Sequence, residues 1–506
     1  MFLKKVFQTY PCLTVFLLGL TSCMSLAPHF FVPVFWVALS IAWLLSDKPH
    51  TYRKALKIGY FYMFGHFVGS VCGVACGIFD HTWYSYLGGV SATLLLSAFL
   101  ALLGFLPFIV WHFLVSRSSW LKILSFASAW ALSEWIQTFF SPSNMAGVMF
   151  ASHPVFLQTA SFGGIYFLSF INILFAGCIY MLFKKRFLNG ILVFSGLLFG
   201  ILLFGFYRTE KYVFENSNIK IRLVQPNIEK KLDLHPPFLS YVTDEHIKLT
   251  LKSQIDDFDF VIWGESALNF KPEYSEYNRK KLQEAIPKNG YLITGITHYD
   301  APNALYDSFW VLDDQAIRQD FYNKHHLIPY GGEYIPFRKY LPKKFQKMKT
   351  FSGDKTDTLR GEKFKTIHLK NYPPFGALIC YDVLFTGEVA SKQDRPEWLI
   401  LISNSSWFLH SNQAYHQFAA AQIRAIEEGL TLVQTSKFGT TALVDPTGKI
   451  HAQLKLTEKG VLDIYLPKTT SIDTIYRHTG DKPIIVLMFI ILLGSVFVSL
   501  HLKKQK

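Results

Sequence analysis

The segment Phe375–Asp382, with the sequence FGALICYD, decides how the second half of the chain is expected to fold. Its first five residues are apolar or small, which predicts a buried strand that ends at Ile379. Cys380 follows at the turn, and a helix is expected from Phe385. A thiol on a sharp strand-to-helix turn is exposed at the sheet edge, where the helix N-terminus lowers the pKa of the thiol and offers N–H donors to an oxyanion. Cys380 is therefore a candidate nucleophile, with a buried structural cysteine as the alternative.

Two further strand ends carry charged side chains that suit such a nucleophile. The apolar run Phe260–Trp263 is followed two residues later by Glu265. The run Ile317–Tyr322 is followed two residues later by Lys324. A carboxylate at the rim of a buried sheet is partly desolvated, which raises its pKa toward that of a useful base. An ammonium nearby can pair with this carboxylate and stabilise a tetrahedral oxyanion, although each residue alone is more often an ordinary strand-end or surface charge.

Residues 207–482 alternate between short β-rich runs and amphipathic helical patterns. This mixture predicts an α/β domain with a large, buried sheet. The expected strands are Ile219–Gln225, Phe260–Trp263, Tyr291–Ile296, Ser308–Leu312, Ile317–Tyr322, Phe375–Ile379, Trp398–Ser403, Thr431–Thr435, Thr441–Val444 and Val461–Tyr465. The expected helices are Pro237–Gln254, Tyr277–Ala285 and Gln413–Glu428.

Composition places much of the remaining chain in lipid. Of the 506 residues, 50% are hydrophobic, 16% are aromatic and only 17% are charged, whereas about a quarter are charged in a soluble globular chain. These values exclude a disordered protein, a collagen-like fibre and an ordinary cytosolic enzyme. Apolar stretches of about twenty residues predict about eight membrane-spanning helices. They are Gln8–Met24, Pro28–Leu45, Ala55–Gly77, Leu87–Val115, Leu121–Phe139, Leu157–Phe183, Phe187–Phe206 and Ile484–Leu502.

The basic residues outside 207–482 predict the orientation of these helices. They lie at the chain termini or beside alternate loops, and the intervening short loops 25–27, 78–86 and 140–156 contain no Lys or Arg. Because basic residues are retained on the cytoplasmic side, both termini are expected in the cytoplasm and residues 207–482 outside it. The basic residues that flank the predicted spans account for most of the net charge of +14. This charge therefore reflects membrane topology, which excludes a nucleic-acid-binding protein.

The expected organisation is a membrane domain of about seven spans (1–206), an extracytoplasmic α/β domain (207–482) and a last span with a basic tail (483–506). An alternative for the N-terminus is a lipoprotein signal cleaved before Cys23. Glu134, near the end of the fifth span, is expected either as a functional intramembrane carboxylate or as an interfacial residue.

The segments around Glu265, Lys324 and Cys380, in this order, resemble the three signatures of the nitrilase, or carbon–nitrogen hydrolase, superfamily. With predicted spans before and after, the whole chain resembles the membrane-embedded apolipoprotein N-acyltransferase family of that superfamily. The resemblance implies an α-β-β-α sandwich and a catalytic triad. Glu265 would be the general base, Lys324 the oxyanion-stabilising cation and Cys380 the nucleophile. Glu333 would be a second glutamate, which holds the lysine and the base in place.

Other positions follow the family's pattern less closely. Tyr381 and Asp382 follow the nucleophile, where Cys-Tyr-Glu is usual. Trp407 and Phe408 are expected substrate or lipid contacts, as is Leu234, which stands where a tryptophan is usual. Further departures are Gly264 for Pro, Ser405 for Asp, and Gly331-Gly332 for a single Gly.

The resemblance implies a monomeric acyltransferase of the bacterial cytoplasmic membrane that needs no cofactor. Its donor would be a phospholipid and its acceptor the amino group of diacylglyceryl-cysteine in an apolipoprotein, with a thioester on Cys380 between the two. The basic and aromatic stretch Phe337–Phe351 suits an anionic lipid interface.

The alternatives are a membrane-tethered amidohydrolase that uses water, and a channel or transporter, which the scarcity of intramembrane charges disfavours. The adjacent His325 and His326, with no paired cysteine, predict no metal site.

Overall fold

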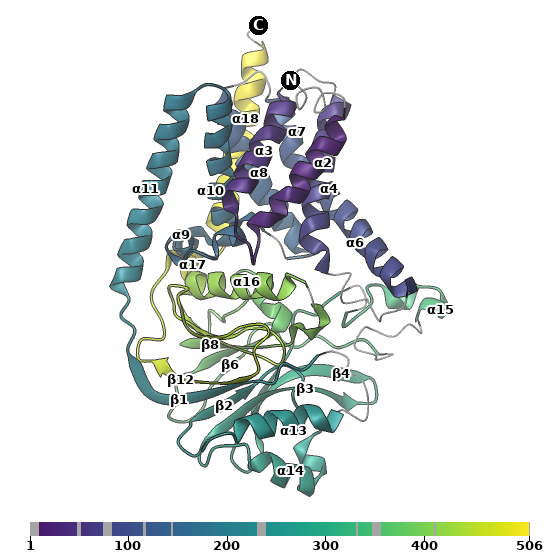
Figure 1. Ribbon diagram of the computed structural model, residues 1–506, viewed down its shortest axis with the longest axis vertical. Coiled ribbons are helices and arrows are strands. Elements are labelled where there is room, and N and C mark those ends of the chain that lie inside the picture. Colours follow the sequence, from purple (N-terminus) through teal and green to yellow (C-terminus); the bar gives the residue numbers. More distant parts are fainter. Residues whose placement is uncertain are drawn as a thin grey trace. The chain divides into compact units, whose positions relative to one another are not determined.

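The computed structural model of the chain describes residues 10–47, 52–73, 83–114, 118–142, 145–229, 239–329, 332–346, 356–408 and 411–504. The chain divides into a helical unit and an α/β unit. The helical unit comprises Met1–Lys211, His410–Glu427 and Thr474–Lys506, and the α/β unit comprises Tyr212–Leu409 and Glu428–Asp473. Figure 1 shows the elements of both units.

The helical unit is built from long apolar helices that pack against one another. Each predicted span coincides with a helix or a pair of helices. These are α2 (Pro11–Ser22), α3 (Val32–Ser46), α4 (Tyr52–Val71), α6 (Trp83–Gly104) with α7 (Leu106–Phe113), α8 (Ser119–Thr138), α10 (Ala160–Phe183), α11 (Phe187–Lys211) and α18 (Lys482–Lys504). The other elements of this unit described below are η1 (Cys23–Ser25), η2 (Ala146–Phe150), α9 (Pro154–Leu157), α16 (Gln413–Glu428) and α17 (Ile475–Thr479).

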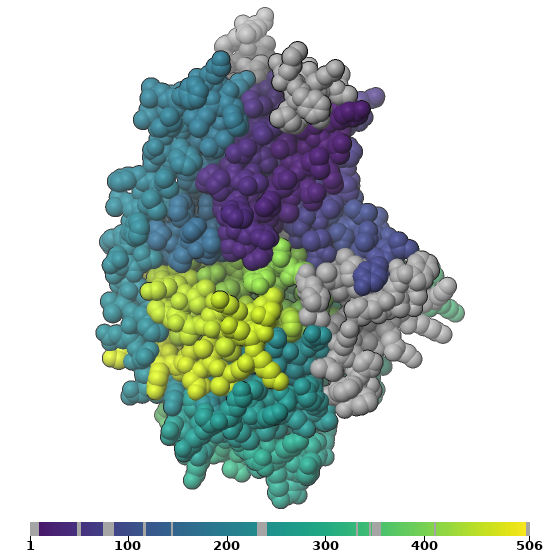
Figure 2. Space-filling model, in the orientation of Figure 1, coloured from purple at the N-terminus to yellow at the C-terminus, as the bar shows by residue number. Residues whose placement is uncertain are grey.

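Four helical segments within the described residues are long and apolar enough to cross a membrane. They are Tyr86–Phe113, Ala160–Phe183, Phe187–Lys211 and Lys482–His501. Helix α11 lies along one side of the helical unit (Figure 2). Several of its apolar side chains are exposed, among them Leu188 at 71% and Phe199 at 68%. A polytopic helical unit is therefore present, and the number of eight spans stays a prediction.

Helix α8 is less apolar than these four because it carries buried charges. Lys122 Nζ lies 2.5 Å from Asp47 Oδ1, and the lysine is 3% exposed. Glu134 is 6% exposed, and its Oε1 accepts a hydrogen bond of 2.7 Å from Ala146 N. Glu134 is thus buried among the helices, and it attaches η2 to α8.

Helix α10 is interrupted near its start, where an unbroken span was predicted. Gly163 and Gly164 leave helical geometry, with φ of 67° at Gly164. The N–H of Ile165, just after the break, donates to Glu427 Oε1 at 2.8 Å. A carboxylate at this new helix N-terminus satisfies a backbone donor that would otherwise have no partner.

The α/β unit contains two six-stranded sheets, with the orders β12-β1-β2-β3-β4-β5 and β11-β10-β9-β8-β7-β6. Strands β1, β2 and β3 run parallel, as do β7, β8 and β9. The first sheet is made of β1 (Asn216–Gln225), β2 (Phe260–Trp263), β3 (Tyr291–Ala301), β4 (Ala304–Leu312), β5 (Arg318–Asn323) and β12 (Gly460–Pro467). The second is made of β6 (Thr366–Ile367), β7 (Phe375–Ile379), β8 (Trp398–Ser403), β9 (Thr431–Ser436), β10 (Thr441–Val444) and β11 (Ile450–Leu454).

The two sheets face each other across one apolar core. Ile221 and Ile262 from the first sheet share this core with Ile379 and Ile400 from the second. Helices α13 (Leu239–Thr250) and α14 (Glu276–Gln283) cover the other face of the first sheet (Figure 1). The α/β class predicted from periodicity and the two packed sheets implied by the resemblance are both present. Periodicity alone indicated one large sheet, because strands buried on both faces read as the same apolar runs in either arrangement.

One local prediction was wrong, and two strands were not predicted. No helix begins at Phe385: Cys380–Leu384 forms a short 3-10 turn, η6, and the described residues 385–397 are loop and bends. The segment after Phe385 contains Gly387 and Pro396 and has no apolar period that could bury a helix face. Strands β6 and β11 were not predicted, because one has two residues and the other is only partly buried.

Candidate active site

The candidate nucleophile, Cys380, lies where β7 meets the turn η6. It is 6% exposed and has φ of 47°, a left-handed conformation that is uncommon for residues other than glycine. All five residues of β7 before it are buried, so the position of the turn is fixed by the core. Backbone strain of this kind persists only where the surroundings impose it, and it is concentrated at functional sites.

Asp382, two residues later, holds the turn in place. It is 1% exposed, and its Oδ2 accepts hydrogen bonds of 3.1 Å from Ile379 N and from the Tyr322 hydroxyl. Its Oδ1 accepts a hydrogen bond of 2.8 Å from His326 N. One carboxylate therefore fixes the segment of Cys380 and the segment that follows β5 to each other.

Lys324 is buried at the end of β5. Its side chain is 1% exposed, and its Nζ lies 2.9 Å from Glu265 Oε1 and 2.5 Å from Glu333 Oε1. The backbone is held on both sides, since Lys324 N donates to Asp307 O and Gly361 N donates to Lys324 O, each at 2.9 Å. The ammonium group is thus paired with two carboxylates in a site closed to solvent.

Glu265 follows β2 on a segment that other strands approach closely. A Cβ at Gly264 would lie 2.2 Å from Lys437 N, and a Cβ at Gly295 would lie 2.6 Å from Glu265 Cα. Neither position has room for a side chain. Glu265 N donates to Ser403 O, at the end of β8, at 3.3 Å. The carboxylate therefore stands on a segment that continues from the first sheet and is hydrogen-bonded to the second.

Glu333 reaches Lys324 despite the extra glycine before it. Its Oε2 accepts a hydrogen bond of 2.6 Å from Ile328 N, and its carbonyl oxygen accepts one of 3.0 Å from Thr358 N. These bonds direct Oε1 to the ammonium group. Gly331 itself lies outside the described residues.

Burial and the charges of neighbouring residues shift the pKa values of Glu265, Glu333 and Lys324. Burial raises the pKa of Glu265, and the effects of Lys324 and of a hydrogen bond with the Cys380 thiol only partly offset it. Burial raises the pKa of Glu333 to about 8. Burial alone would lower the pKa of Lys324, but the two carboxylates outweigh it and raise that pKa well above its ordinary value. Both carboxyl groups therefore take up a proton more readily than free glutamates do, whereas the lysine is held in its ammonium form.

This arrangement has the parts that nucleophilic acyl chemistry needs. Glu265 is a base of raised pKa within hydrogen-bonding reach of the Cys380 thiol. Lys324 is a fixed positive charge close to both, where a negative oxygen could be stabilised at little reorganisation cost. No helix begins at Phe385 in the described residues, so the N–H donors expected from its N-terminus are not provided there. Lys324 is the group that the site offers to stabilise a negative oxygen.

The remaining candidate residues lie around this group or outside the described part of the chain. Tyr381 is partly exposed, and its ring centroid lies 5.3 Å from that of Phe385. Trp407 and Phe408 end the short turn η7 (Ser405–Phe408) and are partly exposed. Leu234 lies outside the described residues, so its expected contact has no structural description.

Some supporting residues were not predicted from the sequence. The Tyr322 hydroxyl donates to Asp382 and also accepts a hydrogen bond of 3.2 Å from His325 N. Gly295 and Gly361 permit close backbone approach beside Glu265 and Lys324, and a Cβ at Gly361 would lie 2.0 Å from Asn323 O. A glycine inside or beside a strand is the only signal that the sequence gives of such an approach.

Two family descriptions match the chain. "Carbon-nitrogen hydrolase" matches residues 220–475, which is half of the chain, and "Apolipoprotein N-acyltransferase N-terminal domain" matches residues 18–178. The chain belongs to the carbon–nitrogen hydrolase family, in its apolipoprotein N-acyltransferase branch. Membership of this branch makes the protein an enzyme of an acyltransferase family, associated with the bacterial inner membrane.

Relatives of the apolipoprotein N-acyltransferase branch match over nearly the whole chain. The apolipoprotein N-acyltransferase of Rickettsia typhi is 29% identical over 500 residues, which covers 96% of this chain and 98% of the relative. That of Rhodopseudomonas palustris is 28% identical over 507 residues, which covers 94% and 93%. Among solved structures, a nitrilase-superfamily amidase from Nesterenkonia AN1 is 16% identical with a TM-score of 0.38, and covers 50% of this chain and 92% of the amidase.

Adding one methyl group at Gly264 tests the close approach beside Glu265. In Gly264→Ala the new Cβ meets a backbone nitrogen, which cannot rotate away, so the fold loses about 1–3 kcal/mol and the unfolding temperature falls by about 2–10 °C. The measurement is a thermal scan of the full-length protein in detergent. Gly460→Ala is the matched control, because no described atom lies within 4 Å of its Cβ position. Equal stability of both variants would contradict the description of this segment.

The raised pKa of Glu333 predicts how stability depends on pH. A carboxyl group whose pKa is higher in the folded chain stabilises the fold at low pH, and this contribution is lost as the pH rises through the folded pKa. Thermal scans should therefore show the unfolding temperature falling between pH 4.5 and about 8, and a smaller fall in Glu333→Gln. Glu215→Gln, in an exposed pair with Lys468, is the control that should keep the wild-type slope. If the unfolding temperature of Glu333→Gln falls with pH as steeply as that of the wild type, another group is responsible for the pH dependence.

Proposed function

We propose that this protein transfers a fatty acyl chain from a phospholipid to the N-terminal amino group of diacylglyceryl-cysteine in an apolipoprotein. The observation that carries the proposal is the buried contact of Lys324 with Glu265 and Glu333, with the Cys380 thiol in hydrogen-bonding reach of Glu265. In this proposal Glu265 is the general base, Lys324 stabilises the oxyanion and Cys380 is the nucleophile. The family of the chain supports the same assignment.

The first half-reaction would load the acyl group onto the enzyme. The Glu265 carboxylate takes the thiol proton, and the Cys380 sulfur attacks the carbonyl carbon of the phospholipid ester. The carbonyl π electrons move to the oxygen, where the Lys324 ammonium stabilises the negative charge. As the tetrahedral intermediate collapses, the ester C–O bond breaks and Glu265 returns the proton to the departing alkoxide. The products are a lysophospholipid and a thioester on Cys380.

The second half-reaction would release the acyl group as an amide. The α-amino nitrogen of the acceptor attacks the thioester carbonyl, and Glu265 removes a proton from that nitrogen. The C–S bond breaks, and the thiolate takes the proton back to restore the starting state. Ester and amine are converted to alcohol and amide, so the sequence balances without a cofactor or a water molecule. Two successive substrates at one nucleophile give ping-pong kinetics.

The neighbours of the proposed catalytic residues keep them in position for both half-reactions. Glu333 keeps Lys324 paired when Glu265 is protonated, because it remains 2.5 Å from the ammonium. Asp382 acts through the backbone of the nucleophile turn, so it is a positioning residue in this mechanism. Its three hydrogen bonds support this positioning role, whichever acceptor the enzyme uses.

The membrane part of the proposal follows from the lipid character of both substrates. Eight spans would leave both termini in the cytoplasm and the α/β unit outside it, as the distribution of basic residues indicates. Phe337 and Tyr340, which are 77% and 74% exposed, suit contact with a lipid interface. Arg338 of the same stretch is already paired with Asp357 at 2.6 Å, and residues 347–351 lie outside the described chain. We further propose that the enzyme acts as a monomer.

Mass spectrometry of the protein after incubation with phospholipid tests this mechanism. Wild-type protein should carry an acyl adduct on Cys380, and Cys380→Ala should carry none. Cys380→Ser should lose transfer to a diacylated lipopeptide by at least about a thousandfold, because an unactivated hydroxyl replaces the thiolate. Cys178→Ala, which removes a buried thiol of α10, should keep both the adduct and transfer.

The acceptor in the same assay separates transfer from hydrolysis. An acylated lipopeptide supports the acyltransferase, whereas free fatty acid released at the same rate with and without lipopeptide would identify an amidohydrolase-like enzyme. Lipopeptide acylation by the Cys380 variants at the wild-type rate would exclude the thioester mechanism.

A further inference from the structure

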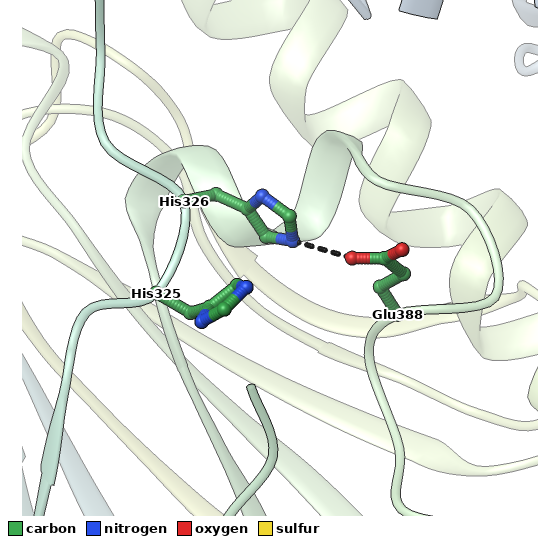
Figure 3. A group of neighbouring side chains, drawn as sticks. All are labelled: His325, His326 and Glu388. Carbon is green, nitrogen blue, oxygen red and sulfur yellow. Dashed lines mark ion pairs between the residues drawn. The ribbon is translucent and has the colours of Figure 1, made fainter. Parts of the chain in front are cut away.

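We propose that His325, His326 and Glu388 form a binding site for a divalent transition-metal ion, with Zn²⁺ as the best-suited ion. One donor atom from each residue lies within 4.8 Å of the others, and the three side chains lie next to one another in the α/β unit (Figure 3). Two imidazole nitrogens and one carboxylate oxygen are a ligand set typical of zinc, with a fourth position left for water. This inference does not depend on the proposed function.

His325 is held in the state that a metal ligand requires. Its Nδ1 lies 2.9 Å from Gly361 O, and because a carbonyl oxygen only accepts hydrogen bonds, Nδ1 carries the proton. Nε2 then keeps its lone pair. A hydrogen bond from the second ring nitrogen to a backbone carbonyl is the usual way in which proteins orient a histidine ligand.

His326 and Glu388 form a close pair. Nε2 of His326 lies 2.8 Å from Glu388 Oε2 (Figure 3). The ring is fixed by stacking on Phe385, with centroids 3.5 Å apart and planes 8° from parallel. A bound ion would replace this direct contact and take both atoms as ligands.

Glu388 offers the negative charge that a cation site needs. Its carboxylate is paired with the Lys363 ammonium group and lies beside the His326 ring. Lys363 Nζ lies 2.6 Å from Oε1, which leaves Oε2 as the oxygen that faces His326. Lys363 is also the competing cation, because it neutralises part of the charge that would attract a metal ion.

The location of this cluster gives a bound ion a structural effect. His325 and His326 directly follow Lys324, and Glu388 follows the turn η6 that begins at Cys380. A metal ion would therefore join the same two segments that Asp382 already joins through His326 N. The sequence predicted no metal site because two adjacent histidines lack a third ligand at a recognisable spacing, and Glu388 comes from a separate segment.

Cobalt(II) absorption spectroscopy on the full-length protein in detergent tests the site, because tetrahedral Co²⁺ absorbs visibly and is a spectroscopic substitute for Zn²⁺. One equivalent of Co²⁺ should bind wild-type protein, give a tetrahedral spectrum and be displaced by Zn²⁺. Glu388→Gln and His325→Ala should each weaken Co²⁺ binding by at least about tenfold. His368→Ala is the matched control, because His368 forms a similar but exposed pair with Asp394 at 3.0 Å.

Removing the competing lysine makes the test independent of folding defects. Lys363→Met should tighten Co²⁺ binding by several-fold, an effect that damage to the fold would not produce. No tetrahedral spectrum with wild-type protein, or wild-type affinity in both Glu388→Gln and His325→Ala, would overturn the proposal. The assay contains no lipid substrate, so its failure leaves the acyltransferase proposal untouched, and the absence of a Cys380 adduct would leave the metal site untouched.

Discussion

A buried ammonium group is the constraint on which the α/β unit depends. Lys324 is 1% exposed, and removing such a charge from water costs several kcal/mol unless opposite charges meet it in good geometry. Glu265 and Glu333 provide these charges from the end of β2 and from the loop after β5. The ends of these strands must therefore stay in register, and the close backbone approaches at Gly264, Gly295 and Gly361 are part of what keeps them there.

The central strands could be predicted from the sequence, and the elements at the margins could not. β2, β7, β8 and β10 have the predicted bounds because strands buried on both faces are continuous apolar runs, bounded by polar residues. Helix α16 also has its predicted bounds, since its apolar period extends over its full length. The helix after Cys380 and the unbroken start of α10 were wrong because local composition at Gly387 and at Gly163–Gly164 overrode a pattern read from their neighbours.

The candidate site could be predicted as a set of strand ends, but its supporting contacts could not. Glu265 and Cys380 each follow an apolar run and Lys324 follows a mixed one, and each residue stands just past the end of a strand, the first sheet carrying Glu265 and Lys324 and the second carrying Cys380. The orientation of those residues depends on groups far apart in the chain, such as Tyr322 and Asp382, whose roles no spacing reveals. The His325, His326 and Glu388 cluster was missed for the same reason.

The route of the chain has a consequence for how this protein can be divided. The polypeptide passes between the two units four times, at residues 211–212, 409–410, 427–428 and 473–474. Helix α16 lies between β8 and β9 in the sequence, yet Ala419, Ile423 and Ile426 belong to the core of the helical unit. A fragment cut at the ends of the α/β region would carry this helix with its apolar face uncovered. The two units are therefore interleaved in the sequence. We expect the α/β unit to be poorly soluble when it is produced alone.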